Sequence, residues 1–340
     1  MSDSSLRIAH LSPAKCLLFQ RLLANKTLAT DVQKKGAQPD VPAGSASVLS
    51  GFRSAGPASV RKLQPADIEL AFEANSAPAE IKARYRHFYN AVSEQLDSTE
   101  FGEFSFFLNY GYVADRNPQY AQVKLPDYFL NKNSVALALE VLGDCTITGC
   151  RILDVGCGRG GTVYVIHRFF SASQILGIDL SSTAISFCKN THKYPRVGFL
   201  EGDAEDLPLR DESFDIVTNL ESSHSYPNIE GFYSEAMRVL KPGGHLLCAD
   251  VLSVQCWKEC AALLEAVGFT VEREQDITTN VLLSCDEIAS ARIHAFNHQR
   301  DTQIVEEFLA LPGSEVYEDM WHRRCAYKIL KLKKSATRKG

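Results

Sequence analysis

Residues 151–161 read Arg-Ile-Leu-Asp-Val-Gly-Cys-Gly-Arg-Gly-Gly, an apolar run that contains one acid and passes directly into a glycine-rich turn. Ile152, Leu153 and Val155 suit a buried parallel strand, and the alternating glycines allow a sharp turn and a close approach of the backbone to a ligand. Residues 162–170 can form the helix that follows. A glycine turn that leads into a helix is the general nucleotide-binding arrangement of parallel sheets, so this stretch indicates NAD, FAD or S-adenosylmethionine.

A second acid stands at the end of the next predicted strand. Residues 175–180 form a short apolar run whose acid, Asp179, lies 25 residues after Asp154. A carboxylate at this point can accept hydrogen bonds from both hydroxyls of a ribose. A third strand begins at Val197 and leads into the acidic stretch 201–206, where a carboxylate can receive the amino group of adenine. Both positions favour a nucleoside ligand.

The remaining elements complete an alternating order of strands and helices. We predict strands at 213–221, 239–250, 271–276 and 322–332, helices at 65–95, 127–142, 182–192 and 253–267, and one or two helices over 286–310. In this order the motifs resemble the class I S-adenosylmethionine-dependent methyltransferase fold over about residues 105–332. The acid on the first strand and the missing helix-side glycine distinguish the turn from the dinucleotide pattern. The resemblance implies an α/β fold with a Rossmann-like, seven-stranded, mostly parallel sheet, a final antiparallel strand inserted, and an N-terminal helical lid.

The same resemblance implies the cofactor S-adenosylmethionine and the residues that contact it. Asp179 and Leu180 are expected at the ribose, and Asp203 and Ala204 at the adenine. The others are expected near the methionine part and the sulfonium: Asp154, Gly156, Gly158, Gly160, Asn219 and Leu220.

The segment after the fourth predicted strand points to a narrower group. Glu-Ser-Ser-His-Ser-Tyr-Pro at 221–227, Arg-Gly-Gly at 159–161 and Ile-Thr-Thr-Asn-Val-Leu at 277–282 are similar to mycobacterial O-methyltransferases of phthiotriol-type lipids and to O-methyltransferase domains of polyketide synthases. A hydroxyl acceptor must lose a proton, and His224 titrates near neutrality, so the resemblance makes it the catalytic base. Glu221 is expected to orient the imidazole or contact the cofactor, with Asp250 as a second, weaker candidate for orienting it. His294, His298 and the loop around Tyr317 are expected at the acceptor pocket.

The segment before the first strand divides into two parts. We predict an N-terminal helix and flexible linker over 1–64, a helical and aromatic lid over 65–145, and the cofactor-binding domain over 146–340. In the lid, Tyr110 and Tyr112 can turn ring faces or hydroxyls toward a sulfonium, or can simply be core residues. Residues 11–23 resemble the opening helix of condensation domains in nonribosomal peptide synthetases. They either dock to an assembly-line protein or pack on their own domain.

Composition narrows the partners and the compartment. With a formal net charge of −5 and a pI near 6.0, the chain is not expected to need nucleic acid. Its apolar runs are too short to span a membrane, and we expect a cytoplasmic protein whose ten cysteines are reduced thiols. The pairs Cys256–Cys260 and His294–His298 have metal-ligand spacing but no obvious companions, so no metal is expected.

Three functions fit these features. The first is methylation of a hydroxyl or enol oxygen of a polyketide, peptide or lipid, free or bound to a carrier protein. The second keeps the cofactor but cyclises it to azetidine-2-carboxylate and methylthioadenosine. The third is a non-catalytic scaffold that retains the cofactor pocket.

Overall fold

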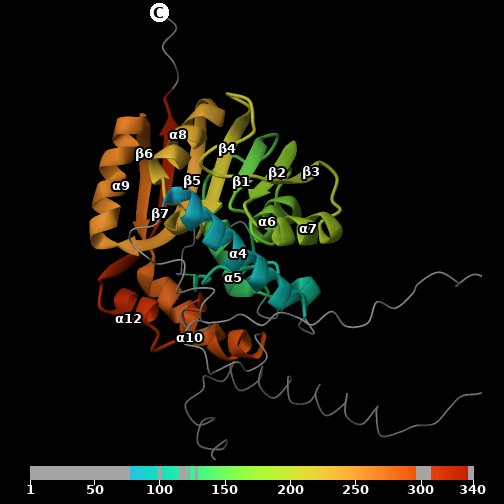
Figure 1. Ribbon diagram of the computed structural model, residues 1–340, viewed down its shortest axis with the longest axis vertical. Coiled ribbons are helices and arrows are strands. Elements are labelled where there is room, and N and C mark those ends of the chain that lie inside the picture. Colours follow the sequence, from blue (N-terminus) through green and yellow to red (C-terminus); the bar gives the residue numbers. More distant parts are fainter. Residues whose placement is uncertain are drawn as a thin grey trace, which may run out of the picture. The chain divides into compact units, whose positions relative to one another are not determined.

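A computed structural model describes residues 77–98, 102–114, 120, 123–126, 129–295 and 308–335. Seven strands form one sheet in the order β3 (Val197–Glu201), β2 (Gln174–Asp179), β1 (Arg151–Val155), β4 (Phe214–Leu220), β5 (Leu240–Ser253), β7 (Cys325–Lys334) and β6 (Phe269–Asp276) (Figure 1). The pairings among β1 to β5 are parallel, and β7 is antiparallel to both of its neighbours. The predicted fold class and the inserted antiparallel strand are confirmed.

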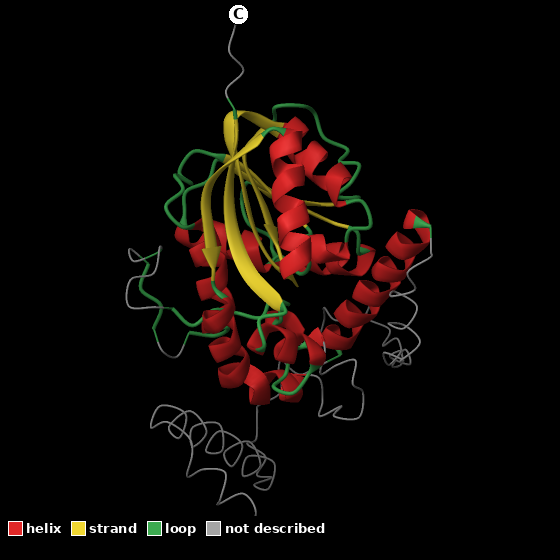
Figure 2. Cartoon of the chain, turned by 90° about the vertical axis from the view of Figure 1, so that its left-hand side faces the viewer, coloured by secondary structure: helices red, strands yellow, loops and turns green. Residues whose placement is uncertain are grey.

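Helices pack on both faces of this sheet, and others lie beyond one end of it (Figure 2). In the described residues the helices are α4 (Pro78–Asp97), α5 (Lys132–Leu142), α6 (Gly161–Phe169), α7 (Ser182–Thr191), α8 (Ile229–Val239), α9 (Val254–Val267), α10 (Thr278–Ala295) and α12 (Glu315–Trp321), with short 3-10 helices η1 (Gly102–Phe104) and η2 (Ser223–Ser225). Alternate strand residues reach opposite cores, because side chains of a strand point to alternating faces. Thus Ile216 belongs to the core cluster that includes residues of α5, α6 and α10, whereas its neighbour Val217 belongs to the cluster that includes residues of α8 and α9.

Local sequence explains some of the element boundaries. Ser181 begins α7 because its side chain accepts a hydrogen bond from the Ala184 N–H, and α9 ends at Gly268, whose φ of 103° suits glycine. The prediction missed α8, although Asn228 caps it, and it placed a loop around Tyr317 where the structure has α12. It also began the helix before that segment at 286, whereas α10 begins at Thr278.

Residues 77–98 and 102–114, here called the cap, lie against the end of the sheet at which the parallel strands terminate. Lys82 and Asn90 of α4 bind Asp203 and Ser181, and the Tyr110 N–H binds Glu221. Predicted helix 65–95 begins in the structure at Pro78; its first residues, and the proposed docking segment 11–23, lie outside the described residues. The domain boundaries near 64 and 145 stay predictions.

One arginine of the glycine turn holds the cap in place. The Arg159 side chain is 0% exposed, and its guanidinium lies 3.4 Å from the centre of the Phe187 ring. Its nitrogens donate to Ser93 Oγ and O, Asp97 Oδ1, Gly102 O and Ser105 O at 2.7–3.1 Å. All of these acceptors belong to the cap, so the guanidinium joins it to the turn between β1 and α6.

We expect Arg159→Lys to loosen the cap selectively. A lysine ammonium has three donors and no planar fork, so several buried carbonyls would lose a partner, at a cost of about 2 kcal/mol or more. Hydrogen exchange of the α4 amides should speed up by roughly 30-fold or more, with the sheet amides unchanged. Arg238→Lys is the matched control, since Arg238 also donates to two carbonyls and two carboxylates but lies 30% exposed, away from the cap. Equal acceleration of α4 in both variants would contradict the prediction.

Candidate functional site

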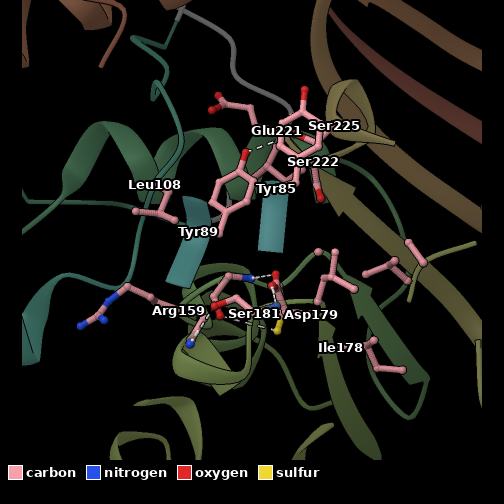
Figure 3. Close-up of a pocket in the computed structure, with 18 of the residues that line it drawn as sticks. Tyr85, Tyr89, Leu108, Arg159, Ile178, Asp179, Ser181, Glu221, Ser222 and Ser225 are labelled. Carbon is pink, nitrogen blue, oxygen red and sulfur yellow. Dashed lines mark hydrogen bonds between the residues drawn. The ribbon is translucent and has the colours of Figure 1, made fainter. Parts of the chain in front are cut away.

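A cleft with an empty volume of about 1280 Å³, part of it open to solvent, lies between the cap and the carboxyl ends of β1, β2 and β4. The predicted site residues that line it are Tyr110, Gly156, Gly158, Asp179, Leu180, Asp203, Ala204, Leu220, Glu221 and His224. Figure 3 shows Tyr85 and Tyr89 near the loop of Ser222 and Ser225, with Asp179 and Ser181 below them.

The Asp179 carboxylate organises the nucleotide end of the cleft. Its Oδ2 accepts the Gly158 N–H at 2.7 Å, and its Oδ1 accepts the Ser181 N–H at 2.8 Å. Each oxygen therefore keeps a lone pair for one ribose hydroxyl. Burial raises the pKa of this carboxyl, and the backbone N–H groups oppose that shift. The geometry fits a vicinal diol.

The acidic loop after β3 forms the far wall. Asp203 Oδ1 accepts the Glu205 N–H at 2.9 Å, and its Oδ2 lies 2.6 Å from Lys82 Nζ, which also pairs with Glu205 Oε2 at 2.6 Å. Apolar surfaces of Ile178, Leu180 and Ala204 complete this end of the cleft. Flat apolar walls beside a carboxylate suit an adenine ring with its amino group.

Four of the predicted site residues do not line the cleft. Asp154 lies beneath it, where its Oδ1 accepts from Thr218 Oγ1 at 2.6 Å, and burial raises the pKa of its carboxyl to about 7. Asn219 Nδ2 donates to Val155 O and the Tyr226 hydroxyl oxygen. Gly160 is the N-cap of α6, and Tyr112 is 1% exposed within the core beside that helix. The expectation that Tyr112 faces a sulfonium is therefore corrected: its ring is core.

His224 and Asp250 form a hydrogen-bonded pair at the end of β4 and β5. Nδ1 of His224 lies 2.8 Å from Asp250 Oδ1, and Asp250 Oδ2 accepts from Ser223 Oγ and the His224 N–H. Burial opposes ionisation of both groups, but each stabilises the charge of the other, so the pKa of His224 is raised and that of Asp250 is lowered. Asp250, the weaker candidate from sequence, is the residue that orients the imidazole.

Glu221 does not bond to His224. Its carboxylate accepts the Tyr110 N–H at 2.8 and 3.1 Å and the Tyr327 O–H at 2.7 Å. Its backbone has a φ of 48°, in the left-handed region that residues with a Cβ seldom adopt. Burial, and secondarily the charge of Asp250, raise the pKa of Glu221 to about 7.

Sequence reasoning missed the contribution of α4 and of β7. Lys82, Tyr85 and Tyr89 all line the cleft, and their spacing of three and four residues places them on one helix face. That spacing was readable in the sequence. Tyr327 gave no such signal, because its contact with Glu221 spans 106 residues of chain.

The sequence predicts neither a metal site nor a membrane-spanning helix. Within them no group of three or more His, Cys, Asp or Glu side chains is arranged to hold a metal ion, and the His294 and His298 side chains fall outside the description. No helix in the described ranges is long and apolar enough to cross a membrane.

Comparison with known proteins identifies the family of this chain. Residues 153–248 match the family described as "Methyltransferase domain". The fatty-acid O-methyltransferase of Mycolicibacterium smegmatis is 32% identical over 234 residues, which make up 66% of this chain and 81% of that protein. The phthiotriol/phenolphthiotriol dimycocerosates methyltransferase of Mycobacterium leprae is 35% identical over 170 residues, 50% of this chain and 61% of that protein.

A solved structure shares the fold. Geranyl diphosphate C-methyltransferase from Streptomyces coelicolor A3(2), in complex with Mg²⁺, geranyl diphosphate and S-adenosyl-L-homocysteine, has a TM-score of 0.57 at 18% identity. The match covers 76% of this chain and 100% of that chain. At this identity the likeness concerns the fold alone.

Proposed function

We propose that this chain, which belongs to the S-adenosylmethionine-dependent methyltransferases, transfers the methyl group to a neutral hydroxyl oxygen of a lipid, polyketide or peptide. S-adenosylmethionine is its cofactor, and when bound it supplies an electrophilic methyl group for an in-line displacement. The observation that carries the proposal is the His224–Asp250 pair at the cofactor cleft.

The residues of the cleft divide among the parts of the cofactor. We assign Asp179 with Leu180 to the ribose and Asp203 with Ala204 to the adenine, since these carboxylates stand beside apolar walls. Gly156, Gly158 and Leu220 then border the methionine part. Asp154 and Asn219 support this surface from beneath by fixing β1 to β4.

His224 is suited to accept the hydroxyl proton. Burial alone would raise the pKa of Asp250, but the interactions with His224 outweigh burial, and the pKa is lowered. The carboxylate is therefore ionised and can only accept hydrogen bonds. Nδ1 of His224 must then carry the hydrogen, which leaves Nε2 as the basic nitrogen. With 35% of its side chain exposed, the imidazole can be reached by an acceptor.

The charges around the cleft favour a hydroxyl over a carboxylate. The names of the two relatives point to a fatty acid, which bears a carboxyl group, and to phthiotriol, whose name denotes hydroxyls. Among the described lining residues the long cations are already paired, Lys82 with Asp203 and Glu205, and Arg159 with Asp97. A carboxylate near His224 would instead meet Glu221 and Asp250, and like charges at close range repel.

A matched pair of acceptors tests this choice. We expect methyl hydroxystearate, which has a free hydroxyl but no free carboxyl, to be converted to a methyl ether, and stearic acid to give little methyl ester. Mass spectrometry of the products reports which oxygen is methylated. Equal or faster formation of methyl stearate would contradict the proposal.

The same reactions without acceptor separate the other two functions. Cofactor cyclisation would yield methylthioadenosine from S-adenosylmethionine alone, whereas we expect S-adenosylhomocysteine only when an acceptor is present. A non-catalytic scaffold would yield neither. The relatives are named as methyltransferases, which favours methyl transfer over both alternatives.

A further inference from the structure

Glu221 is a partly buried carboxylate whose hydrogen-bond donors are all neutral. They are the Tyr110 N–H and the Tyr327 O–H, and among the described residues no salt bridge joins Glu221 to a Lys, Arg or His. The other acids of the cleft have different partners. Asp203 and Glu205 share Lys82, and Asp179 holds two backbone N–H groups at the ribose end.

Such an arrangement is costly without a cation in contact with the carboxylate. The Arg292 guanidinium stabilises Glu221 only from a distance, because it donates its hydrogen bonds to Leu309 O and Asn109 O. Removing a carboxylate from water is unfavourable unless a cation compensates, and neutral donors compensate only in part. The left-handed backbone at Glu221 adds strain, and strained backbone of this kind clusters at functional sites. A carboxylate that is kept at the wall of a ligand cleft despite both costs is suited to pair with a positive charge on the ligand.

We propose that Glu221 binds a cationic centre of the cofactor, either the sulfonium or the ammonium of its methionine part. Glu221 follows β4 directly and lines the same cleft as the glycine turn and His224, whereas the nucleoside acids lie at the ends of β2 and β3. The inference rests on the cofactor assignment for this cleft, and it is independent of the acceptor and of the base role of His224.

The binding should be linked to pH. The titratable and charged groups that face Glu221 are Tyr110 from the cap, Tyr327 from β7, Asp250 from β5, His224 from η2, and Cys285 and Arg292 from α10. With these neighbours the pKa of its carboxyl is about 7. A bound cation favours the ionised carboxylate and lowers this pKa, so binding below pH 7 must expel a proton. Affinity should therefore fall as the pH drops below about 7, by at most tenfold per pH unit.

Isothermal titration of the full chain, without acceptor, tests the proposal with three probes. S-adenosylmethionine carries both cations, S-adenosylhomocysteine carries the ammonium only, and methylthioadenosine carries neither. For Glu221→Gln, which keeps an oxygen to accept from Tyr110 and Tyr327, we expect about tenfold weaker binding of S-adenosylmethionine. If the sulfonium is the partner, S-adenosylhomocysteine binding is unchanged; if the ammonium is, both weaken alike.

Methylthioadenosine binding and the pH dependence of affinity test whether Glu221 acts through its charge. Methylthioadenosine binding should not change, and the loss of affinity below pH 7 should disappear in Glu221→Gln. The matched control is Glu140→Gln, which neutralises a carboxylate that is 1% exposed and does not line the cleft. Unchanged S-adenosylmethionine binding in Glu221→Gln, or an equal loss for methylthioadenosine, would overturn the proposal. A failed base role of His224 would leave all these binding results intact.

Discussion

Replacing His224 by alanine is expected to lower kcat for methyl transfer by about 100-fold to 10,000-fold, the usual contribution of a positioned base. Cofactor affinity should stay essentially unchanged, because the nucleoside carboxylates are untouched. The variant should also fold, since Asp250 still accepts from Ser223 Oγ and from the N–H groups of residues 224 and 251. Single-turnover kinetics at saturating cofactor and a titration of S-adenosylhomocysteine measure the two quantities. Full activity of the alanine variant would remove the base role.

The pH profile gives the control for this variant. The neutral imidazole is the active form, so kcat should rise with pH through the pKa of His224. Burial alone would lower that pKa, but the charge and the hydrogen bond of Asp250 outweigh burial and raise it. Asp250→Asn removes the charge, so the rising limb should move to lower pH while kcat falls. A limb that stays in place would show that His224 is not the group observed.

Replacing Gly156 by alanine is expected to disrupt the packing of the cofactor cleft. The φ of Gly156 is 70°, and a Cβ there would lie 2.0 Å from Ser222 Oγ and 2.8 Å from the Tyr226 hydroxyl oxygen. The left-handed backbone costs a residue with a Cβ about 1–2 kcal/mol, and the overlap adds roughly 1–3 kcal/mol. We expect a corresponding loss in the free energy of unfolding measured in urea, and cofactor binding at least about tenfold weaker.

Two variants separate the backbone effect from the overlap. Gly243 has a φ of 79°, and a Cβ there would meet nothing within 4 Å, so Gly243→Ala measures the backbone cost alone. Adding Ser222→Gly to Gly156→Ala removes the nearer obstacle and should restore part of the stability. If Gly156→Ala and Gly243→Ala lose the same stability, close packing at the glycine turn is not the cause.

Much of the fold follows from features that lie close together in the chain. The apolar runs that contain Asp154 and Asp179 predicted β1 and β2, the second to within one residue of each end, because a buried parallel strand needs a continuous apolar segment. Ser181 and Gly268 mark helix ends through contacts with residues at most four positions away. Such signals are legible before any tertiary structure exists.

The site depends more on contacts between distant segments. Which acid orients His224 could not be read from the sequence, since Glu221 is three residues away and Asp250 is 26, yet the strand pairing brings Asp250 to the imidazole. Tyr112 looked like a site residue beside Tyr110 because the aromatic run gives no clue to which ring faces the cleft. Packing against α5 and α10 decides that question.

The antiparallel insertion of β7 also sets the order in which the protein can mature. Tyr327 reaches Glu221 across the sheet, and β7 pairs with β5 and β6, which precede it in the chain. On the ribosome, the segment through β6 emerges with a gap beside β5 that only the later strand can fill. Long-range pairing of this kind slows folding and leaves a strand edge exposed in the meantime. The nascent chain therefore cannot hold its cofactor cleft in final form until residue 327 has left the exit tunnel.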